Sequence, residues 1–255
     1  MAENKKLPTY KRQRFLLAFI RQIKDGVTAT ELQKLVFLYT MKEKSKFYDF
    51  IPYKFGAYSF QLAEDVDIFC RDGYISTEVS HIRAVGDYQY EVLFSIPSER
   101  GDKLIRKAYR EYPYFTINSE ITGRLFNALE VEQFKHVKQY YVQMGQTLFT
   151  IGYEGKSVEG FINVLIKNDI RVLCDVRKNP LSRKFGFSKR KLRHIVETIG
   201  IKYLHIPELG IESAKRSLLD TIDDYQCLFS EYAEMLPNRK PQLDYLYSLL
   251  RDNVR

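Results

Sequence analysis

The chain has few cysteines and no long apolar run, and each absence excludes a class of protein. Its three cysteines, Cys70, Cys174 and Cys227, lie far apart without metal-ligand spacing, which argues against a disulfide framework or a zinc knuckle. We interpret them as buried thiols. No stretch approaches the roughly 18 apolar residues that span a bilayer, and the polar N-terminus is unlike a secretory signal. We therefore expect a cytoplasmic protein with no membrane, metal or cofactor site.

Positive charge is abundant. The formal net charge is +8 and the isoelectric point is near 9.2. Clustered lysines and arginines gain affinity for phosphates because binding releases counterions. An anionic partner is therefore favoured, although charge alone does not identify it.

The N-terminal half begins with helical patterns. Residues 11–24 carry apolar side chains at helical spacing, and a second helix is predicted over 28–44, where Thr28 and Glu31 form a capping-box pattern. A third helix over 60–72 is predicted to end at Gly73, which tolerates the left-handed conformation.

A β-hairpin is predicted after these helices. Residues 74–96 are rich in β-forming residues on both sides of Gly86-Asp87, where we place the turn. Further helices are expected at 98–111 and 118–141. Three helices followed by a hairpin suggest a winged-helix arrangement. The aromatic row before the third helix is interpreted as core, with stacking on bases as the alternative: Tyr48, Tyr53, Phe55, Tyr58 and Phe60.

A different pattern starts at Thr147. A short buried strand is predicted at TLFTI, then a helix from Ser157, a strand at IRVLCDVR, a helix at SKRKLRHIVETIG and a strand at IKYLHIP. This alternation predicts a Rossmann-like α/β domain with a parallel sheet over residues 147–255, after a mostly helical domain over 1–146. Ligands of such sheets bind beyond the carboxyl ends of the strands, here after Ile151, Asp175 and His205.

Two groups of residues follow the predicted strand that ends at Asp175. Asp175 and Arg177 either face a ligand or form an internal salt bridge that fixes the loop. Farther along, Arg183 and Lys184 precede Phe187, a combination suited to phosphates and stacked bases. No acid occurs from Lys178 to Lys191, which favours an anion-binding surface over a merely solvated loop.

Two weaker candidates lie at the other strand ends. The turn from Gly152 and Tyr153 to Ser157 offers backbone amides to an anion, but it lacks the Walker spacing of an ATPase. His205 and Glu208 resemble an acid–base pair, although a lone histidine on an apolar strand is more often a hydrogen-bonded core residue.

The C-terminal motifs resemble a known family. TIGYEGKSVEGF, VLCDVRKNPLSRKFGFSKRKL and GIKYLHIPELGIESAKR are similar to the domain of unknown function 488 family, over residues 147–255. Members continue past YLYSLLRDNVR into another strand and a Cys-His-Arg motif, whereas this sequence ends at Arg255. We therefore expect a C-terminally incomplete domain. Either the chain is a truncated product, or another segment or a second copy supplies the missing sheet edge, which makes a homo-oligomer plausible.

The N-terminal half resembles a second family. ELQKLVFLYT and PYKFGAYSFQLAEDVDIFCRDGYI, within residues 11–85, look like the Panacea domain of antitoxin-like proteins, with Ala57 where that family has a proline. The resemblance implies interaction with protein or nucleic acid rather than catalysis.

Three functions remain open at this point. The first is a module that associates with nucleic acid or a nucleotide and holds phosphate through its basic loop. The second is an enzyme acting on a nucleotide-like anion, with Asp175 as acid–base or sugar-binding group and Arg177 and Arg183 on the phosphate. The third is an antitoxin-like adaptor that binds protein.

Overall fold

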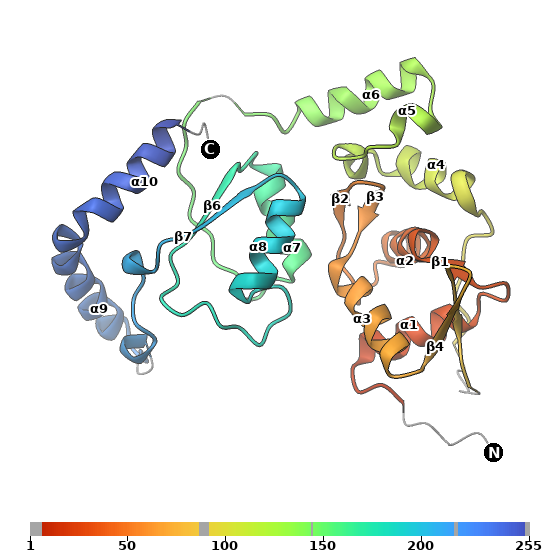
Figure 1. Cartoon of the computed structure of the whole chain (residues 1–255), viewed down its shortest axis with the longest axis horizontal. Helices are drawn as coiled ribbons and strands as arrows, with labels where there is room; N and C mark the ends of the chain where they lie inside the picture. The colour runs from red at the N-terminus through yellow and green to blue at the C-terminus, as the bar shows by residue number, and fades with distance from the viewer. Residues whose placement is uncertain (1–6, 87–91, 144, 217–218, 253–255) are drawn as a thin grey trace. The chain divides into compact units, whose positions relative to one another are not determined.

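The computed structural model describes residues 7–86, 92–143, 145–216 and 219–252 (Figure 1). The chain divides into two compact units, which we describe separately. Unit 1 comprises residues 1–140 and 156–163, and unit 2 comprises residues 141–155 and 164–255. Helices and the three small sheets found among these residues make this a mixed α/β protein. In the described ranges, no helix is long and apolar enough to cross a membrane.

Unit 1 opens with three helices, which confirms the helical predictions for its first 73 residues. These are α1 (Lys11–Arg21), α2 (Ala29–Glu43) and α3 (Phe60–Arg71). Thr28 and Glu31 form the expected capping box of α2. Gly73 has a φ of +69° just after α3, as a helix-terminating glycine should.

The predicted hairpin exists, but its turn lies elsewhere. β4 (Ile75–Glu78) pairs antiparallel with β5 (His81–Ala84), and β1 (Val27–Thr28) completes the order β1-β5-β4. The connecting residues are Val79 and Ser80, with φ of 46° and 65°. Our placement of the turn at Gly86-Asp87 was wrong because two non-glycine residues adopt the left-handed conformation that such turns require. Residues 87–91 of the predicted second strand lie outside the described residues, and 92–96 form no strand.

The remainder of unit 1 is a short hairpin and a second group of helices. β2 (Ile51–Tyr53) pairs antiparallel with β3 (Gly56–Tyr58). The helix predicted over 118–141 is two helices, because Asn127 caps a new one. The later elements are α4 (Gly101–Glu111), η1 (Pro113–Thr116), α5 (Thr122–Leu125) and α6 (Ala128–Gln139).

The core of unit 1 is rich in aromatic side chains. Phe19, Phe37 and Phe69 are fully buried. Of the aromatic row read from the sequence, Tyr48 is buried, whereas Phe55 is 47% exposed. Tyr53, Tyr58 and Phe60 form a ring cluster, with centroids 4.9 to 5.6 Å apart. Most of the row therefore packs within the unit.

Unit 2 contains the predicted parallel sheet. β6 (Val172–Asp175) and β7 (Lys202–His205) pair in parallel through α8 (Lys189–Thr198), and Asp175 lies opposite His205 in the register. In α7 (Val158–Lys167), residues 164–167 belong to this unit. The elements after β7 are η2 (Pro207–Leu209), η3 (Ser213–Arg216), α9 (Ile222–Met235), η4 (Leu236–Arg239) and α10 (Lys240–Asp252).

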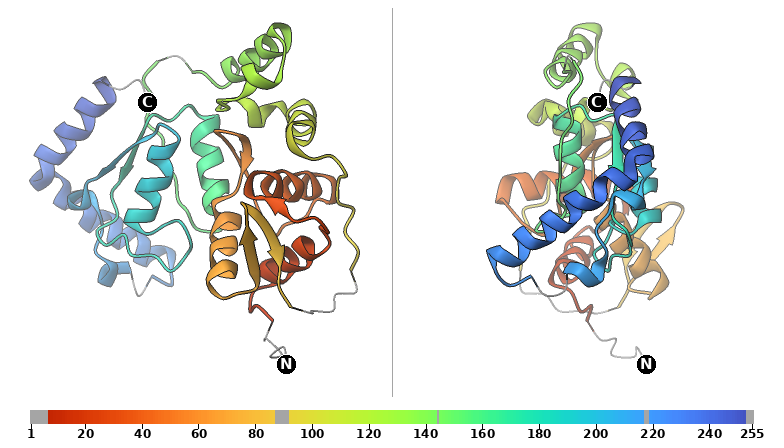
Figure 2. Two further views of the ribbon diagram at one scale, coloured as in Figure 1. Left: turned by 45° about the vertical axis from the view of Figure 1, so that its right-hand side comes forward. Right: turned by 90° about the vertical axis from the view of Figure 1, so that its left-hand side faces the viewer.

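Helices flank the two strands on both sides. Figures 1 and 2 place α8 on one side of β6 and β7, and α9 and α10 on the other. Leu249 of α10 packs with Ile206 and Leu209, against Leu204 and Cys174 on the strands. Because side chains alternate along a strand, Asp175, Tyr203 and His205 face away from that apolar layer. The polar strand ends are thus separated from the α10 side.

Two sequence predictions for these regions were wrong. Residues 147–151 form no strand, and Leu148 and Phe149 are 61% and 44% exposed, because the segment joins no ladder in the described sheet. The cysteines are also not buried: Cys70 and Cys227 are exposed and Cys174 is intermediate. Cys70 and Cys227 directly neighbour Phe69 and Leu228, the residues that turn inward, and therefore face outward on their helices.

Candidate functional site

A buried carboxylate marks the end of β6. Asp175 is 6% exposed. Its Oδ1 accepts hydrogen bonds from the Arg177 backbone nitrogen at 3.1 Å and from Arg177 Nε at 2.8 Å. Its Oδ2 accepts from Arg177 Nη2 at 2.6 Å and from the Tyr203 hydroxyl at 2.5 Å. Four donors therefore bind the carboxylate. Of the two roles that the sequence left open for Asp175 and Arg177, contact with a ligand or an internal salt bridge, the structure contains the salt bridge.

These contacts hold Asp175 ionised. Burial alone would raise the pKa of Asp175, but the hydrogen bonds from Arg177 and Tyr203 outweigh it and lower the pKa. Burial and the neighbouring carboxylate raise the pKa of Tyr203. An aspartate stabilised as the anion, beside a tyrosine stabilised as the neutral phenol, is suited to positioning rather than to proton transfer.

Arg177 links this carboxylate to the following loop. Its Nη1 donates to the Phe187 backbone oxygen at 2.8 Å. Since Nε and Nη2 are bound to Asp175, all three guanidinium nitrogens have partners inside the unit. Arg177 thereby fixes both ends of the loop that runs from residue 178 to 187. These bonds use three of the five N–H groups of the guanidinium, and its role as a phosphate ligand stays a prediction.

His205 is also fully engaged. Its Nε2 lies 2.9 Å from the Arg177 backbone oxygen, and its Nδ1 lies 2.7 Å from Lys189 Nζ. A carbonyl oxygen only accepts, so Nε2 carries the hydrogen and Nδ1 accepts from the lysine. In the described residues, no hydrogen bond or ion pair joins His205 to Glu208, which is exposed. The geometry therefore matches the hydrogen-bonded histidine that the sequence analysis favoured over an acid–base pair.

Aromatic rings support the same loop from within. Tyr153 and Phe187 stack with centroids 4.7 Å apart, and Phe187 is 0% exposed. The Arg177 guanidinium lies 5.3 Å from the Tyr153 ring. Lys184 Nζ lies 5.6 Å from the Phe187 ring and donates to the Tyr153 backbone oxygen at 3.3 Å. Phe187 is thus a core anchor here, and Lys184 is partly committed to holding the loop.

The loop is closed on itself. The Lys189 nitrogen donates to the Pro180 oxygen at 3.0 Å, and the Phe187 nitrogen donates to the Lys184 oxygen at 3.2 Å. Gly186 has a φ of +84°, which suits a tight reversal. The loop and the first turn of α8 therefore form one compact segment.

Three cations of this segment have no partner among the described residues. We call residues 178–193 the basic surface: it carries seven Lys or Arg residues and no acid. Arg193 pairs with Glu197 at 2.9 Å. Within the described ranges, the exposed side chains of Lys178, Arg183 and Arg190 make no hydrogen bond or ion pair. These three cations remain available to an external anion.

The turn after residue 151 is the least developed of the predicted sites. Gly152 is exposed, and a Cβ built on it would meet no atom within 4 Å. Residues 147–151, which were expected to form the strand before this turn, form no strand. The backbone amides of the turn are therefore not held in place by a strand end. The turn contributes Tyr153 to the aromatic stack instead.

Gly210 is a site residue that the sequence analysis did not single out. A Cβ on Gly210 would lie 2.1 Å from the Val176 oxygen and 2.6 Å from the Lys178 nitrogen. Its φ of −90° is open to any residue, so close packing and not backbone conformation requires glycine here. The glycine is visible in the string ELGIES, but only the structure shows that Gly210 lies against the backbone of residues 176–178. Tyr203 and Lys189 were likewise missed as partners of Asp175 and His205.

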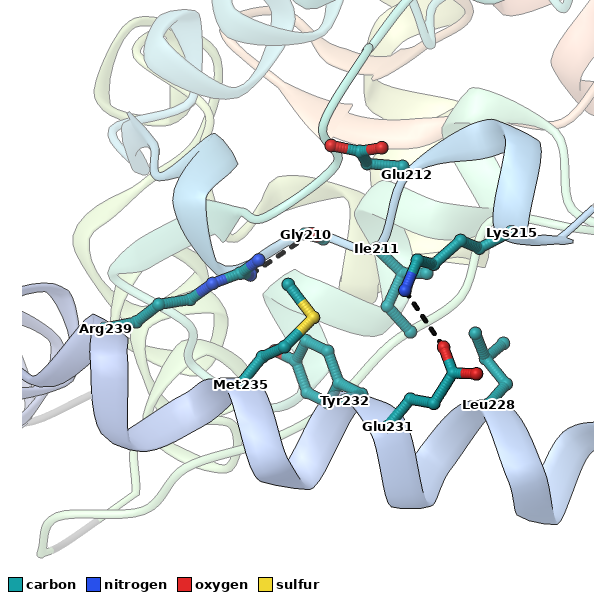
Figure 3. A pocket seen from close by; sticks show the side chains of 9 residues that line it. All are labelled: Gly210, Ile211, Glu212, Lys215, Leu228, Glu231, Tyr232, Met235 and Arg239. Carbon is teal, nitrogen blue, oxygen red and sulfur yellow. Dashed lines mark hydrogen bonds and ion pairs between the residues drawn. The ribbon is translucent and has the colours of Figure 1, made fainter.

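A small cavity lies beyond Gly210, on the α9 side of unit 2. It measures about 90 Å³, and Figure 3 shows Ile211, Tyr232 and Met235 among the side chains that line it, with Arg239 at one end and a Lys215–Glu231 ion pair at the other. Drug-sized ligands occupy roughly 300–1,000 Å³. The cavity is too small for a nucleotide. Among the described residues, no group of three or more His, Cys, Asp or Glu side chains could hold a metal ion.

Comparison with known proteins agrees with the C-terminal motifs. Residues 157–254 match the family described as Domain of unknown function DUF488, which confirms the resemblance predicted there. No curated protein and no solved structure matches the chain. The resemblance of residues 11–85 to the Panacea domain stays a prediction. The cluster of Asp175, Arg177, Tyr203 and His205 therefore lies within the segment that is similar to the DUF488 family.

Proposed function

We propose that unit 2 is a phosphate-binding module that associates with nucleic acid through its basic surface. The observation that carries the proposal is a set of three exposed cations that have no partner in the part of the chain that the structure describes. Lys178, Arg183 and Arg190 lie on a closed loop and the helix turn that follows it. Phosphate backbones bind such cations by counterion release, without any need for a deep pocket. The small size of the cavity beside Gly210 fits this mode better than recognition of a free nucleotide.

The buried cluster at the strand ends supports the loop in this proposal. Asp175 and Arg177 hold the loop ends, and Tyr153 and Phe187 stack beneath it. A preorganised loop loses less conformational freedom when it binds. No catalytic step is assigned to Asp175 or His205, because internal hydrogen bonds occupy the groups that a reaction would need.

Unit 1 plays a different part in the proposal. The element order α1, β1, α2, β2, β3, α3, β4, β5, in which the β2–β3 hairpin is inserted between α2 and α3, and the sheet order β1-β5-β4 support a winged-helix-like arrangement. DNA-binding proteins of that kind use the helix before the hairpin as the reading element. Here that helix is α3, and its Glu64 and Asp67 lie on its accessible side. Since acids there repel phosphates, we assign nucleic-acid contact to unit 2 and protein contact to unit 1.

The test is binding of fluorescent single- and double-stranded DNA and RNA over a salt series. We expect the native chain to bind with a negative slope of log affinity against log salt. In the variant Lys178→Ala/Arg183→Ala/Arg190→Ala, the slope should become shallower. For single strands its magnitude should fall by about two, at about 0.7 per lost phosphate contact.

A matched variant controls for net charge. Arg171→Ala/Lys202→Ala/Lys240→Ala removes three exposed cations of unit 2 from outside the basic surface. It should bind nearly as the native chain does. If both variants lose binding equally, the basic surface has no special role, and if the native chain shows no salt-dependent binding, the proposal fails.

A further inference from the structure

The small cavity on the α9 side of unit 2 has a mostly apolar lining. Ile211, Leu228 and Met235 contribute apolar side chains to its wall (Figure 3). The Tyr232 ring adds to them, and its hydroxyl is already used because it donates to the Leu209 oxygen at 2.6 Å. An apolar cavity of about 150 Å³ holds benzene, and this one measures about 90 Å³. The apolar part of a ligand is therefore smaller than benzene, a chain of about two or three carbons.

One cation at the end of this cavity has donors to spare. Arg239 reaches from η4 toward Gly210, and its Nη1 donates to the Gly210 oxygen at 3.4 Å (Figure 3). Its guanidinium carbon lies 6.0 Å from the centre of the Tyr232 ring. Among the described residues, neither Nε nor Nη2 of Arg239 makes a hydrogen bond or ion pair. These two nitrogens form one edge of the guanidinium, and such an edge matches the two oxygens of a carboxylate.

The other cation of the lining is already engaged. Lys215 Nζ pairs with Glu231 at 2.9 Å, at the end of the cavity away from Arg239 (Figure 3). The pKa of Lys215 is raised by the Glu231 carboxylate and further by that of Glu212. Two acids therefore already attract Lys215, so it offers little to an added anion. An anion is best held at the Arg239 end.

We infer that the cavity binds a short-chain carboxylic acid as its anion. The carboxylate lies on the Nε–Nη2 edge of Arg239, and the alkyl chain lies against Ile211 and Met235. Ligand sites commonly combine apolar walls with a few polar groups that fix the orientation of the ligand. A bare phosphate would leave the apolar walls uncovered, and a neutral ligand would leave Arg239 without a counter-charge. This site lies apart from the basic surface and does not depend on nucleic-acid binding.

The methionine in the cavity wall can report binding directly. In the full chain, isotope-labelled at its methionine methyl groups, Met235 is the reporter and Met41 of α2 is the internal control. The spectrum of Met235→Leu identifies the Met235 signal. Sodium propionate, with ionic strength held constant by sodium chloride, should shift this signal along a saturable curve, with half-saturation in the millimolar range or below. The Met41 signal should not move.

Related ligands separate the contributions of the carboxylate and the alkyl chain. Propionamide has nearly the same shape without the charge, propylamine reverses the charge, and inorganic phosphate lacks the alkyl chain. Each should bind at least about tenfold more weakly than propionate. N-acetyl-aspartate amide presents a carboxylate attached to a peptide backbone, and it should also bind more weakly because the cavity is too small for the added groups. Equal or tighter binding of this compound would assign the cavity to a protein carboxylate and overturn the free acid as ligand.

Substitutions test the two halves of the site. Arg239→Gln should raise the half-saturating concentration of propionate at least about tenfold, and Arg239→Lys should recover only part of the loss, because lysine has no two-pronged edge. Ile211→Phe reduces the space for the alkyl chain without changing any charge, and it should weaken binding as well. Lys240→Gln removes the exposed cation next in sequence and should bind propionate as the native chain does. Thermal unfolding without ligand checks that each variant is folded.

Three results would overturn the inference. They are a Met235 signal that shifts without saturating, native affinity in a folded Arg239→Gln or Ile211→Phe variant, and equal binding of propionate and propionamide. Weaker binding to Glu212→Gln would also contradict it, because removal of a negative charge from the lining should favour an anion.

Failure of the nucleic-acid proposal is distinguishable from failure of this inference. Lys178→Ala/Arg183→Ala/Arg190→Ala changes only the basic surface and should bind propionate as the native chain does. Arg239→Gln leaves the basic surface intact and should bind DNA and RNA as the native chain does. If propionate binds while the native chain binds no nucleic acid, the carboxylate site stands alone. If nucleic acid binds and propionate does not, only the phosphate-binding role survives.

Discussion

Each unit buries an aspartate against an arginine and a tyrosine, but the two clusters connect different parts of the chain. In unit 1, Asp65 accepts from Arg12 Nε at 2.8 Å, from Gln13 Nε2 at 2.8 Å and from the Tyr48 hydroxyl at 2.9 Å. These partners lie 17 to 53 residues away in sequence. In unit 2, the arginine partner of Asp175 is only two residues away and the tyrosine lies on the adjacent strand.

The same chemistry therefore serves two purposes. The Asp65 cluster joins α1 to α3 and to the segment before β2, so it holds unit 1 together. The Asp175 cluster shapes the loop that carries the basic surface. A substitution at Asp65 should act mainly on stability, and one at Asp175 should act on binding as well.

The largest effect is expected from Asp65→Ala. Removing one partner of a buried ion pair costs about 3–5 kcal/mol, because Arg12, 27% exposed at its side chain, loses its counter-charge. Urea unfolding followed by circular dichroism measures the loss, and hydrogen exchange assigns it to unit 1. Asp67→Ala on the exposed side of the same helix is the control, at about 0.5 kcal/mol or less. Equal losses for the two variants would refute the structural role of Asp65.

Asp175→Asn should cost less and act on the loop. Hydrogen bonds to charged groups contribute about 1.5–3 kcal/mol, and Arg177 at 18% side-chain exposure can recover some hydration. Amides of residues 178–188 should exchange faster, while those of α1 and α3 keep their native rates. Uniformly faster exchange across unit 1 would mean that the two clusters are not independent.

Gly210→Ala tests the packing beside the loop. The added Cβ would overlap the Val176 oxygen, so we expect a cost of about 1–3 kcal/mol and displacement of residues 176–178. Gly152→Ala is the matched control, because its Cβ would meet no atom within 4 Å. Thermal unfolding of the two variants measures the difference. A neutral Gly210→Ala would show that the loop backbone shifts freely.

Lys34 gives unit 1 a pH dependence of its own. This lysine is 1% exposed, and burial lowers its pKa to about 7 from 10.5. Between these values the unfolded chain binds the extra proton, so stability should rise with pH, by up to about 1.4 kcal/mol per pH unit. Below pH 7 Lys34 is protonated in both the folded and the unfolded chain, so its unfavourable contribution to the free energy of folding no longer changes with pH.

The measurement is urea unfolding from pH 7 to pH 9, compared with Lys34→Met. In this window Glu159, whose pKa burial raises to about 7, is still titrating, but it does so in both proteins and its contribution cancels in the comparison with Lys34→Met. The native chain should gain stability relative to Lys34→Met as the pH rises. A constant difference between the two would mean that Lys34 stays charged in the fold.

The smallest stability effect is expected from the triple substitution on the basic surface. Lys178, Arg183 and Arg190 contact no partner within the described chain, so Lys178→Ala/Arg183→Ala/Arg190→Ala should change the free energy of unfolding by about 0.5 kcal/mol or less. Chemical denaturation checks this. A large loss would show that these cations support the fold, and the loss of binding in this variant would then be uninformative.

Much of the fold could be predicted because its signals are local. The capping box at Thr28 and Glu31, the terminating Gly73 and the apolar spacing of α8 depend on neighbours within one or two turns. The turn at Val79-Ser80 could not be predicted, because neither residue favours positive φ. The segment 147–151 has the composition of a strand, but composition does not reveal whether a pairing edge is free.

The site was predictable in position but not in detail. The strand-end rule located Asp175, Arg177 and His205, and the absence of acids located the basic surface. Which cations stay unpaired depends on contacts between distant residues. Lys189 reaches His205 sixteen residues away, and Gly210 touches the loop at Val176. Spacing along the chain contains no sign of either contact.

The central claim is that the Asp175 cluster presents the free cations of the basic surface to phosphate. Binding of single-stranded DNA at low salt, compared between Asp175→Asn and Asp65→Asn under conditions where both variants remain folded, tests it most directly. We expect Asp175→Asn to weaken binding about tenfold, a loss of about 1.4 kcal/mol, while Asp65→Asn binds as the native chain does. Native affinity in Asp175→Asn, or an equal loss in both variants, would contradict the account.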